Sequence, residues 1–123
     1  MFLWDVFYVI LDPPKILSLN CFVDSDRKEV KKIFLVQVPE TENVGFLRSS
    51  IKKEKVSLKN VDISYLDLIR VSIPVNGDFE ENLKSIESEG ELAPTLVLSR
   101  VFPRVEEGHL HIFVRTSTDR ESY

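Results

Sequence analysis

The order of the apolar segments along this chain constrains its fold more than any other feature. Segments 16–23 and 31–38 each carry apolar residues at every second position, which predicts two half-buried strands. The turn-forming residues 24–26 separate them so closely that an antiparallel hairpin is expected. A helical pattern over 44–55 and a third apolar strand over 65–74 follow. The chain is therefore predicted to build a two-layer α+β domain.

The predicted helix has a clear start and one apolar face. Asn43 is the expected N-cap, because its side chain can accept a hydrogen bond from a free backbone N–H of the first turn. Three apolar residues follow at the spacing of one helical face: Val44, Leu47 and Ile51. The basic residues at the other end are interpreted as a solvated cluster favoured by the helix dipole: Lys52, Lys53 and Lys55.

The second half of the chain supplies a short helix and the last strand. Apolar residues spaced for a short amphipathic helix follow the third strand: Phe79, Leu83 and Ile86. Segment 95–102 is interpreted as a short strand, and segment 109–115 as the final strand. In the final strand we expect three residues to face the core: Leu110, Ile112 and Val114. The alternate residues are expected to face outward: His109, His111 and Phe113.

These elements predict a specific α+β fold. In a β-grasp domain the last strand lies beside the first, in the middle of the sheet, and segment 109–115 is the candidate for that place. We therefore predict a ubiquitin-like β-grasp: a mixed four- to five-stranded sheet with one main helix packed across it and a second short helix.

Composition limits the classes of partner and chemistry. The chain has 123 residues, of which 43% are hydrophobic and 29% charged, which suits one globular domain with its own core. Its net charge is -4 with acids and bases interspersed, so we expect no nucleic-acid partner. Cys21 is the only cysteine, which excludes an intrachain disulfide and a thiolate zinc site. Because Cys21 lies on the apolar face of the first strand, we interpret it as a core residue, with a reactive thiol as the alternative.

Residues 1–15 form an apolar N-terminal extension that ends in a pair of prolines. The apolar run 1–11 is shorter than the roughly 20 residues that a bilayer-spanning helix needs, so no membrane span is expected. It also lacks the basic start and the small-residue cleavage site of a standard secretory signal peptide. Three interpretations of the extension stay open: an extra edge strand, a partner-binding segment or an artefact of gene prediction.

The sequence offers little reaction chemistry. His109 and His111 share a face of the final strand and could ligate one ion, but a zinc site needs three or four ligands and the spacing places no third. The adjacent carboxylates at 80–81 and 106–107 are interpreted as solvated caps. No phosphate-binding glycine loop or nucleophile elbow is present. We therefore predict no catalytic, cofactor-binding or metal-binding residues, and a protein that is not an enzyme.

Four segments in order carry a resemblance to a known family: LSLNC at 17–21, TENVGFLRSSIKKEK at 41–55, YLDLIRVSIP at 65–74 followed by FEENL at 79–83, and EEGHLHIFV at 106–114. They resemble the first strand, the helix, the third strand and the closing motif of the N-terminal header domain of Crinkler effectors, in its fungal form. The resemblance implies a ubiquitin-like header domain over 16–117 and a polar tail over 118–123, with the effector domain absent.

The resemblance also implies a secreted effector that acts inside a host cell, with its N-terminal domain taking part in delivery. The oomycete signature Leu-Phe-Leu-Ala-Lys would fall on residues 68–72, where only the first position is identical. The translocation-motif-like residues implied here are six: Leu66, Leu68, Ile69, Arg70, Val71 and Ser72.

Three functions compete at this point. The first is a non-enzymatic header module of a secreted Crinkler-type effector, which contacts host or self proteins through its sheet or surface. The second is an intracellular ubiquitin-like adaptor that recruits a partner through the sheet. The third is a metal-dependent hydrolase that uses His109 and His111.

Overall fold

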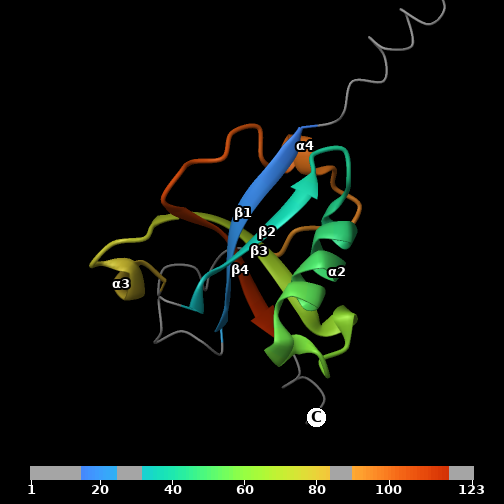
Figure 1. Cartoon of the computed structure of the whole chain (residues 1–123), viewed down its shortest axis with the longest axis horizontal. Coiled ribbons are helices and arrows are strands. Elements are labelled where there is room, and N and C mark those ends of the chain that lie inside the picture. The colour runs from blue at the N-terminus through green and yellow to red at the C-terminus, as the bar shows by residue number, and fades with distance from the viewer. Residues whose placement is uncertain (1–14, 25–31, 84–89, 117–123) are drawn as a thin grey trace, which may run out of the picture.

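The computed structural model describes residues 15–24, 32–83 and 90–116, and predictions that concern other residues lie outside it. The described strands are β1 (Ile16–Val23), β2 (Phe34–Pro39), β3 (Leu66–Pro74) and β4 (His109–Thr116). The described helices are α2 (Val44–Glu54), α3 (Phe79–Leu83) and α4 (Leu98–Val101), with 3-10 turns η3 (Val56–Leu58) and η4 (Ile63–Tyr65). Figure 1 shows the strands beside the long helix α2.

The last strand lies beside the first in the middle of the sheet, as predicted. The order is β2-β1-β4-β3. β1 pairs antiparallel with β2 and parallel with β4, and β3 pairs antiparallel with β4. The predicted hairpin is thus confirmed, with Leu19 opposite Val36. A mixed four-stranded sheet of this order with one helix across it is a β-grasp fold, so the predicted fold class is confirmed.

The main core lies between α2 and one face of the sheet. The predicted helix face is buried, and Val44, Leu47 and Ile51 pack on alternate residues of the hairpin strands. The hairpin residues in this core are Leu17, Leu19, Cys21, Val23, Val36 and Val38. The predicted cap is also confirmed, because the Asn43 Oδ1 atom accepts a hydrogen bond from the Phe46 N–H at 2.9 Å.

A glycine in the first turn of α2 allows another segment to approach. The Gly45 N–H donates to the Pro94 carbonyl oxygen at 3.0 Å. A Cβ atom at this position would lie 3.3 Å from the Asn43 Oδ1 atom and 3.5 Å from the Pro94 oxygen. This close approach explains a residue that otherwise costs about 1 kcal/mol against alanine in a helix.

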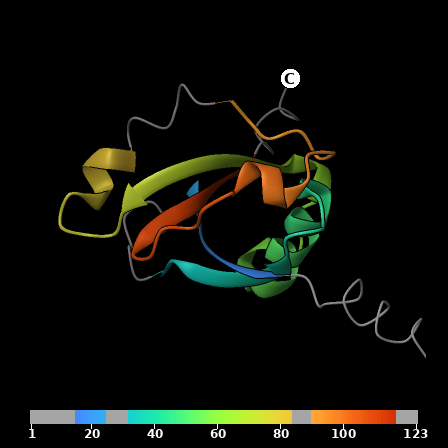
Figure 2. The ribbon, with the colours of Figure 1, turned by 90° about the horizontal axis from the view of Figure 1, so that it is seen from above.

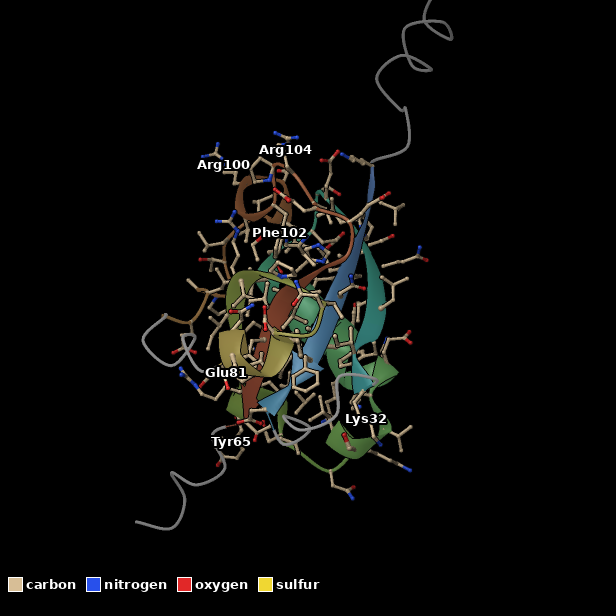
Figure 3. All side chains as sticks on the ribbon, turned by 90° about the vertical axis from the view of Figure 1, so that its left-hand side faces the viewer. Lys32, Tyr65, Glu81, Arg100, Phe102 and Arg104 are labelled. Carbon is tan, nitrogen blue, oxygen red and sulfur yellow. The ribbon has the colours of Figure 1, made fainter. Side chains whose placement is uncertain are left out.

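Segment 95–102 is not the short strand that we predicted. Val97 makes only an isolated bridge with Asn43, and the chain then turns into α4. The buried side chains of Leu98, Val101 and Phe102 are spaced three and four residues apart, which fits a helix better than a strand. Figure 3 shows Arg100 and Arg104 extending outward at this end of the molecule, with Phe102 further in.

A second core covers part of the opposite face of the sheet, which corrects the prediction for β4. His111 and Phe113 were expected to face solvent, but both are buried. Phe113 belongs to a cluster with Phe22, Ile69, Ile73, Phe79, Leu83 and Leu110. The Phe22 and Phe79 rings meet edge to face, with their centroids 5.5 Å apart. Helix α3, which supplies Phe79, lies on the other side of the sheet from α2 (Figures 1 and 2).

Leu110 is buried as predicted, but it packs in the second cluster, whereas Ile112 and Val114 pack in the main core. The helix predicted after the third strand is confirmed over α3, and its expected contact Ile86 lies outside the described residues. The proposed extension over 1–15 and the tail over 118–123 also lie largely outside them, so these boundaries stay predictions.

Candidate interaction surface

The translocation-motif-like residues all lie on β3, and half of them are core residues. Leu66 and Leu68 are buried in the main core, while Ile69 is buried in the second core. The outer edge of β3 is hydrogen-bonded at Leu68 to another segment of the chain, because the Leu92 N–H donates to the Leu68 carbonyl oxygen at 2.7 Å. This part of the motif strand therefore holds the fold together and offers its side chains to no partner.

The rest of the motif strand contains a β-bulge. Arg70 pairs with Ile112 and Ile73 pairs with Leu110, so two residues of β3 lie opposite one residue of β4. The two bulged residues are Val71 and Ser72. Arg70 and Ser72 are exposed and Val71 is half-buried. A partner that contacts this strand directly can therefore reach chiefly Arg70 and Ser72.

The predicted histidine pair is tied into the backbone. The Nδ1 atom of His111 accepts a hydrogen bond from the Asn20 N–H at 2.9 Å. The Nε2–H of the same ring donates to the Glu106 carbonyl oxygen at 2.7 Å, so this geometry requires the neutral tautomer. The His109 ring contacts the Glu107 carbonyl oxygen through Nδ1 at 3.0 Å.

These contacts leave His111 without a free lone pair for a metal ion. No group of three or more His, Cys, Asp or Glu side chains in the described part of the chain is placed to hold a metal ion. Glu106 and Glu107 are exposed, which agrees with the interpretation of solvated carboxylates. Residues 15–24, 32–83 and 90–116 therefore do not assemble the metal site that the hydrolase hypothesis needs.

We expect His111 to make the sheet sensitive to acid. Burial lowers the pKa of His111 below its usual 6.5, and the neighbouring His109 charge adds to this, while the Glu106 carbonyl and carboxylate oppose it. Protonation at Nδ1 would remove the only acceptor that the ring offers to the Asn20 N–H. The side chain of Asn20 reinforces the same junction by donating to the His109 carbonyl oxygen at 2.8 Å.

We expect His111→Asn to remove part of the acid sensitivity of folding. Because the folded pKa is the lower one, the stability that neutral His111 contributes is complete above about pH 6.5 and is lost as the pH falls through the folded pKa. Asparagine keeps an oxygen acceptor but does not titrate. Wild type should therefore lose more free energy of unfolding than the variant between about pH 7.5 and pH 5, measured by urea unfolding.

His109→Asn is the matched control for this experiment. The described contact of the His109 ring through Nδ1 is with the Glu107 carbonyl oxygen, whereas the Asn20 N–H of the neighbouring strand donates to His111. This control should keep most of the pH dependence of wild type. Equal losses of stability in wild type and His111→Asn would contradict the role of the His111 ring.

Cys21 is a core residue, as interpreted from its place in the strand. It is fully buried, and burial raises the pKa of its thiol well above the usual range. The Sγ atom lies 3.6 Å from the Leu19 carbonyl oxygen, as a weak donor. A thiol that stays protonated and inaccessible is a poor nucleophile, so the alternative of a reactive cysteine is not supported.

A basic concave surface lies at the carboxyl end of α2. We call it the lysine groove, and it is lined by Ser49, Lys52, Lys53, Lys55, Val56, Lys59 and Ile63. These residues come from α2, η3 and η4 and the short connections between them. From the sequence, the lysines at 52, 53 and 55 were interpreted as solvated, and Val56 and Ile63 as apolar anchors of a loop. The structure instead places Val56, Lys59 and Ile63 on one surface with these lysines, and Val56 is exposed. The four lysines within segment 52–59 are a sequence signal for a basic surface, but not for its concave shape.

A second accessible surface lies on the outer face of the hairpin strands. Ile16 is 52% exposed and Leu35 is 50% exposed, although both belong to strands. Between them the Gln37 side chain donates to the Ser18 hydroxyl oxygen at 3.2 Å. A shallow hollow reaches from these strands to Glu106 and His111. This surface is distinct from the part of the outer face that α3 covers.

The described residues contain no helix of the length and apolar character that crossing a bilayer requires.

Comparison with known proteins agrees with this fold. The C-terminal ubiquitin-like domain of mouse tubulin-specific chaperone e is similar in structure, with a TM-score of 0.52, 23% sequence identity and coverage of 86% of this chain and 91% of that one. This likeness confirms the ubiquitin-like class of β-grasp fold. A subunit of the mitochondrial glutamyl-tRNA(Gln) amidotransferase of Debaryomyces hansenii is 32% identical over 80 residues, which are 60% of this chain but 16% of that protein.

A family match covers most of the chain. The model of the Crinkler effector protein N-terminal domain matches residues 17–115, which run from β1 into β4. The resemblance stated from four short segments is therefore confirmed, and the chain belongs to the Crinkler N-terminal domain family.

Proposed function

We propose that this chain is the N-terminal header module of a secreted Crinkler-type effector, which works without catalysis and takes part in delivery to a host cell. The observation that carries the proposal is the family match over 17–115, which runs from β1 into β4 and includes β2, α2 and β3. A non-enzymatic role is supported by the chemistry of the described residues. The thiol of Cys21 is buried, and both ring nitrogens of His111 are occupied by backbone groups.

The test is to follow the tagged chain when its own organism produces it in contact with a host. We expect it to accumulate in the host cytoplasm or nucleus. Retention in the producing cell would contradict the proposal. A tagged unrelated protein of similar size, expressed from the same promoter, controls for leakage from damaged cells.

The motif strand can be tested in the same experiment. Arg70 and Ser72 are exposed, so the double variant Arg70→Ala with Ser72→Ala should fold as wild type does. Reduced delivery of this folded variant would support a role for the motif-like strand. Normal delivery would remove the strand from the mechanism and leave the delivery role to another surface.

An intracellular ubiquitin-like adaptor is the second candidate, and the exposed apolar pair Ile16 and Leu35 favours it. Isolated apolar side chains on a sheet surface are ordinary, but a pair beside a hollow is a suitable contact for a partner. Affinity capture with the tagged chain separates the two functions. Host proteins as the specific partners favour the secreted effector module, and proteins of the producing cell favour the adaptor.

A further inference from the structure

The lysine groove concentrates positive charge on a chain that is acidic overall. Four lysines line it, no acidic residue does, and the net charge of the whole chain is -4. Among the described residues, Lys52, Lys53 and Lys59 form no ion pair. The charge of these three lysines is therefore available to a partner of opposite sign.

Asp62, the acidic residue that precedes Ile63 of the groove, is already hydrogen-bonded. Asp62 caps η4, where its Oδ1 atom accepts from the Ser64 N–H at 2.9 Å and from the Ser64 hydroxyl at 2.8 Å. These hydrogen bonds lower the pKa of Asp62, and the charge of Lys52 lowers it further. Asp62 thus stays ionised in its own turn and does not line the groove.

The groove also presents apolar surface. Val56 is 83% exposed, the highest exposure among the large hydrophobic residues that the structure describes. Ile63 lines the same surface and packs against the main core from its edge. The aliphatic stems of the lysines extend this apolar area, since lysine side chains keep only the ammonium group in water.

We propose that the lysine groove binds an acidic segment of a partner protein that carries an apolar side chain among its carboxylates. The carboxylates would pair with the lysines, and the apolar side chain would cover Val56. Each exposed pair contributes little, about 0.2–1 kcal/mol, so several pairs and the apolar contact are needed for useful affinity.

The same groove fits nucleic acid less well. Its lining contains no aromatic side chain on which a base could stack and no arginine to form two hydrogen bonds with a base edge. The groove proposal does not depend on delivery to a host, so each can fail without the other.

The chain offers a matched pair of charge-reversal variants. Lys53→Glu with Lys59→Glu changes two exposed cations of the groove. Arg100→Glu with Arg104→Glu changes two exposed cations at the far end of the molecule from Tyr65 of η4, as Figure 3 shows. Both variants alter the net charge equally. A difference between them in peptide affinity would therefore come from the position of the changed residues and not from the overall charge.

The experiment titrates the full chain into a fluorescent Glu-rich peptide with one central leucine, at low salt. We expect Lys53→Glu with Lys59→Glu to weaken binding about tenfold, and the arginine variant to change it less than about threefold. Val56→Ser should weaken binding of this peptide but not of a copy with alanine in place of leucine. Thermal unfolding checks that every variant is folded.

Three results would overturn the proposal. The first is no saturable binding of the leucine peptide by wild type, and the second is an equal loss in the two charge variants. The third is tighter, groove-dependent binding of single-stranded DNA, of phosphatidylserine vesicles or of a second copy of the chain. That result would assign the groove to the tighter ligand.

Discussion

Replacing Leu68 and Ile69 together by alanine should unfold most of the chain at room temperature. Each buried Leu or Ile truncation costs about 2–5 kcal/mol, and the total stability of a small domain is about 5–15 kcal/mol. The two side chains belong to different cores on opposite faces of the sheet, so they share few partners and their costs should largely add. Far-UV circular dichroism and urea unfolding measure the loss.

The exposed half of the motif strand provides the control. Arg70→Ala with Ser72→Ala should stay within about 0.5 kcal/mol per site of the wild-type stability, because neither side chain is buried. The same urea midpoint for the two double variants would contradict the burial that the structure gives Leu68 and Ile69. If the prediction holds, a variant changed at positions 68 and 69 would fail to be delivered because it does not fold. Such a failure would not identify a contact with a docking partner.

The hairpin and the main helix could be predicted because each has one face in water. Alternation along β1 separates the buried Leu17 and Leu19 from the exposed Ser18, and the α2 face repeats with a helical period. In both elements the repeat of apolar residues matches the residues buried in the main core, although Phe22 of β1 is also buried, in the second core. The N-cap at Asn43 is equally local, since the bond joins residues three apart.

For β4, the alternation of residues along the strand gave a wrong prediction of which side chains are exposed, because this central strand is covered on both faces. His111 keeps a polar character yet is 5% exposed, since the Asn20 N–H and the Glu106 carbonyl oxygen satisfy its ring. Phe113 is covered by a cluster to which α3, a distant segment of the chain, contributes. Periodicity within β4 holds no information about that distant cover.

The lysine groove was beyond sequence reasoning for a related reason. Its lysines were visible, but a concave surface depends on how the chain turns between α2 and β3. The two 3-10 turns that shape this connection rest on local bonds such as the Asp62 cap. Short turns carry weak periodic signals, so the exposed position of Val56 and its meeting with Ile63 emerge only in three dimensions.

The second core makes a prediction that separates α3 from a loosely attached surface helix. α3 has only five residues, too few for stability on its own, so its place depends on what it buries. Phe79 is buried and meets Phe22 edge to face, and Leu83 is fully buried in the same cluster. If α3 is part of the folded domain, removing the Phe79 ring must destabilise the whole chain and not only this helix.

We therefore expect Phe79→Ala to cost about 3–5 kcal/mol of unfolding free energy and to expose the outer face of the sheet to a hydrophobic dye. Val56→Ala is the matched control, because it also truncates a hydrophobic side chain but one that is 83% exposed, and it should change stability by less than about 0.5 kcal/mol. Urea unfolding compares the two variants under identical conditions. Equal midpoints would mean that the outer face is stable without α3, and that Phe22 and Phe113 do not depend on this cover.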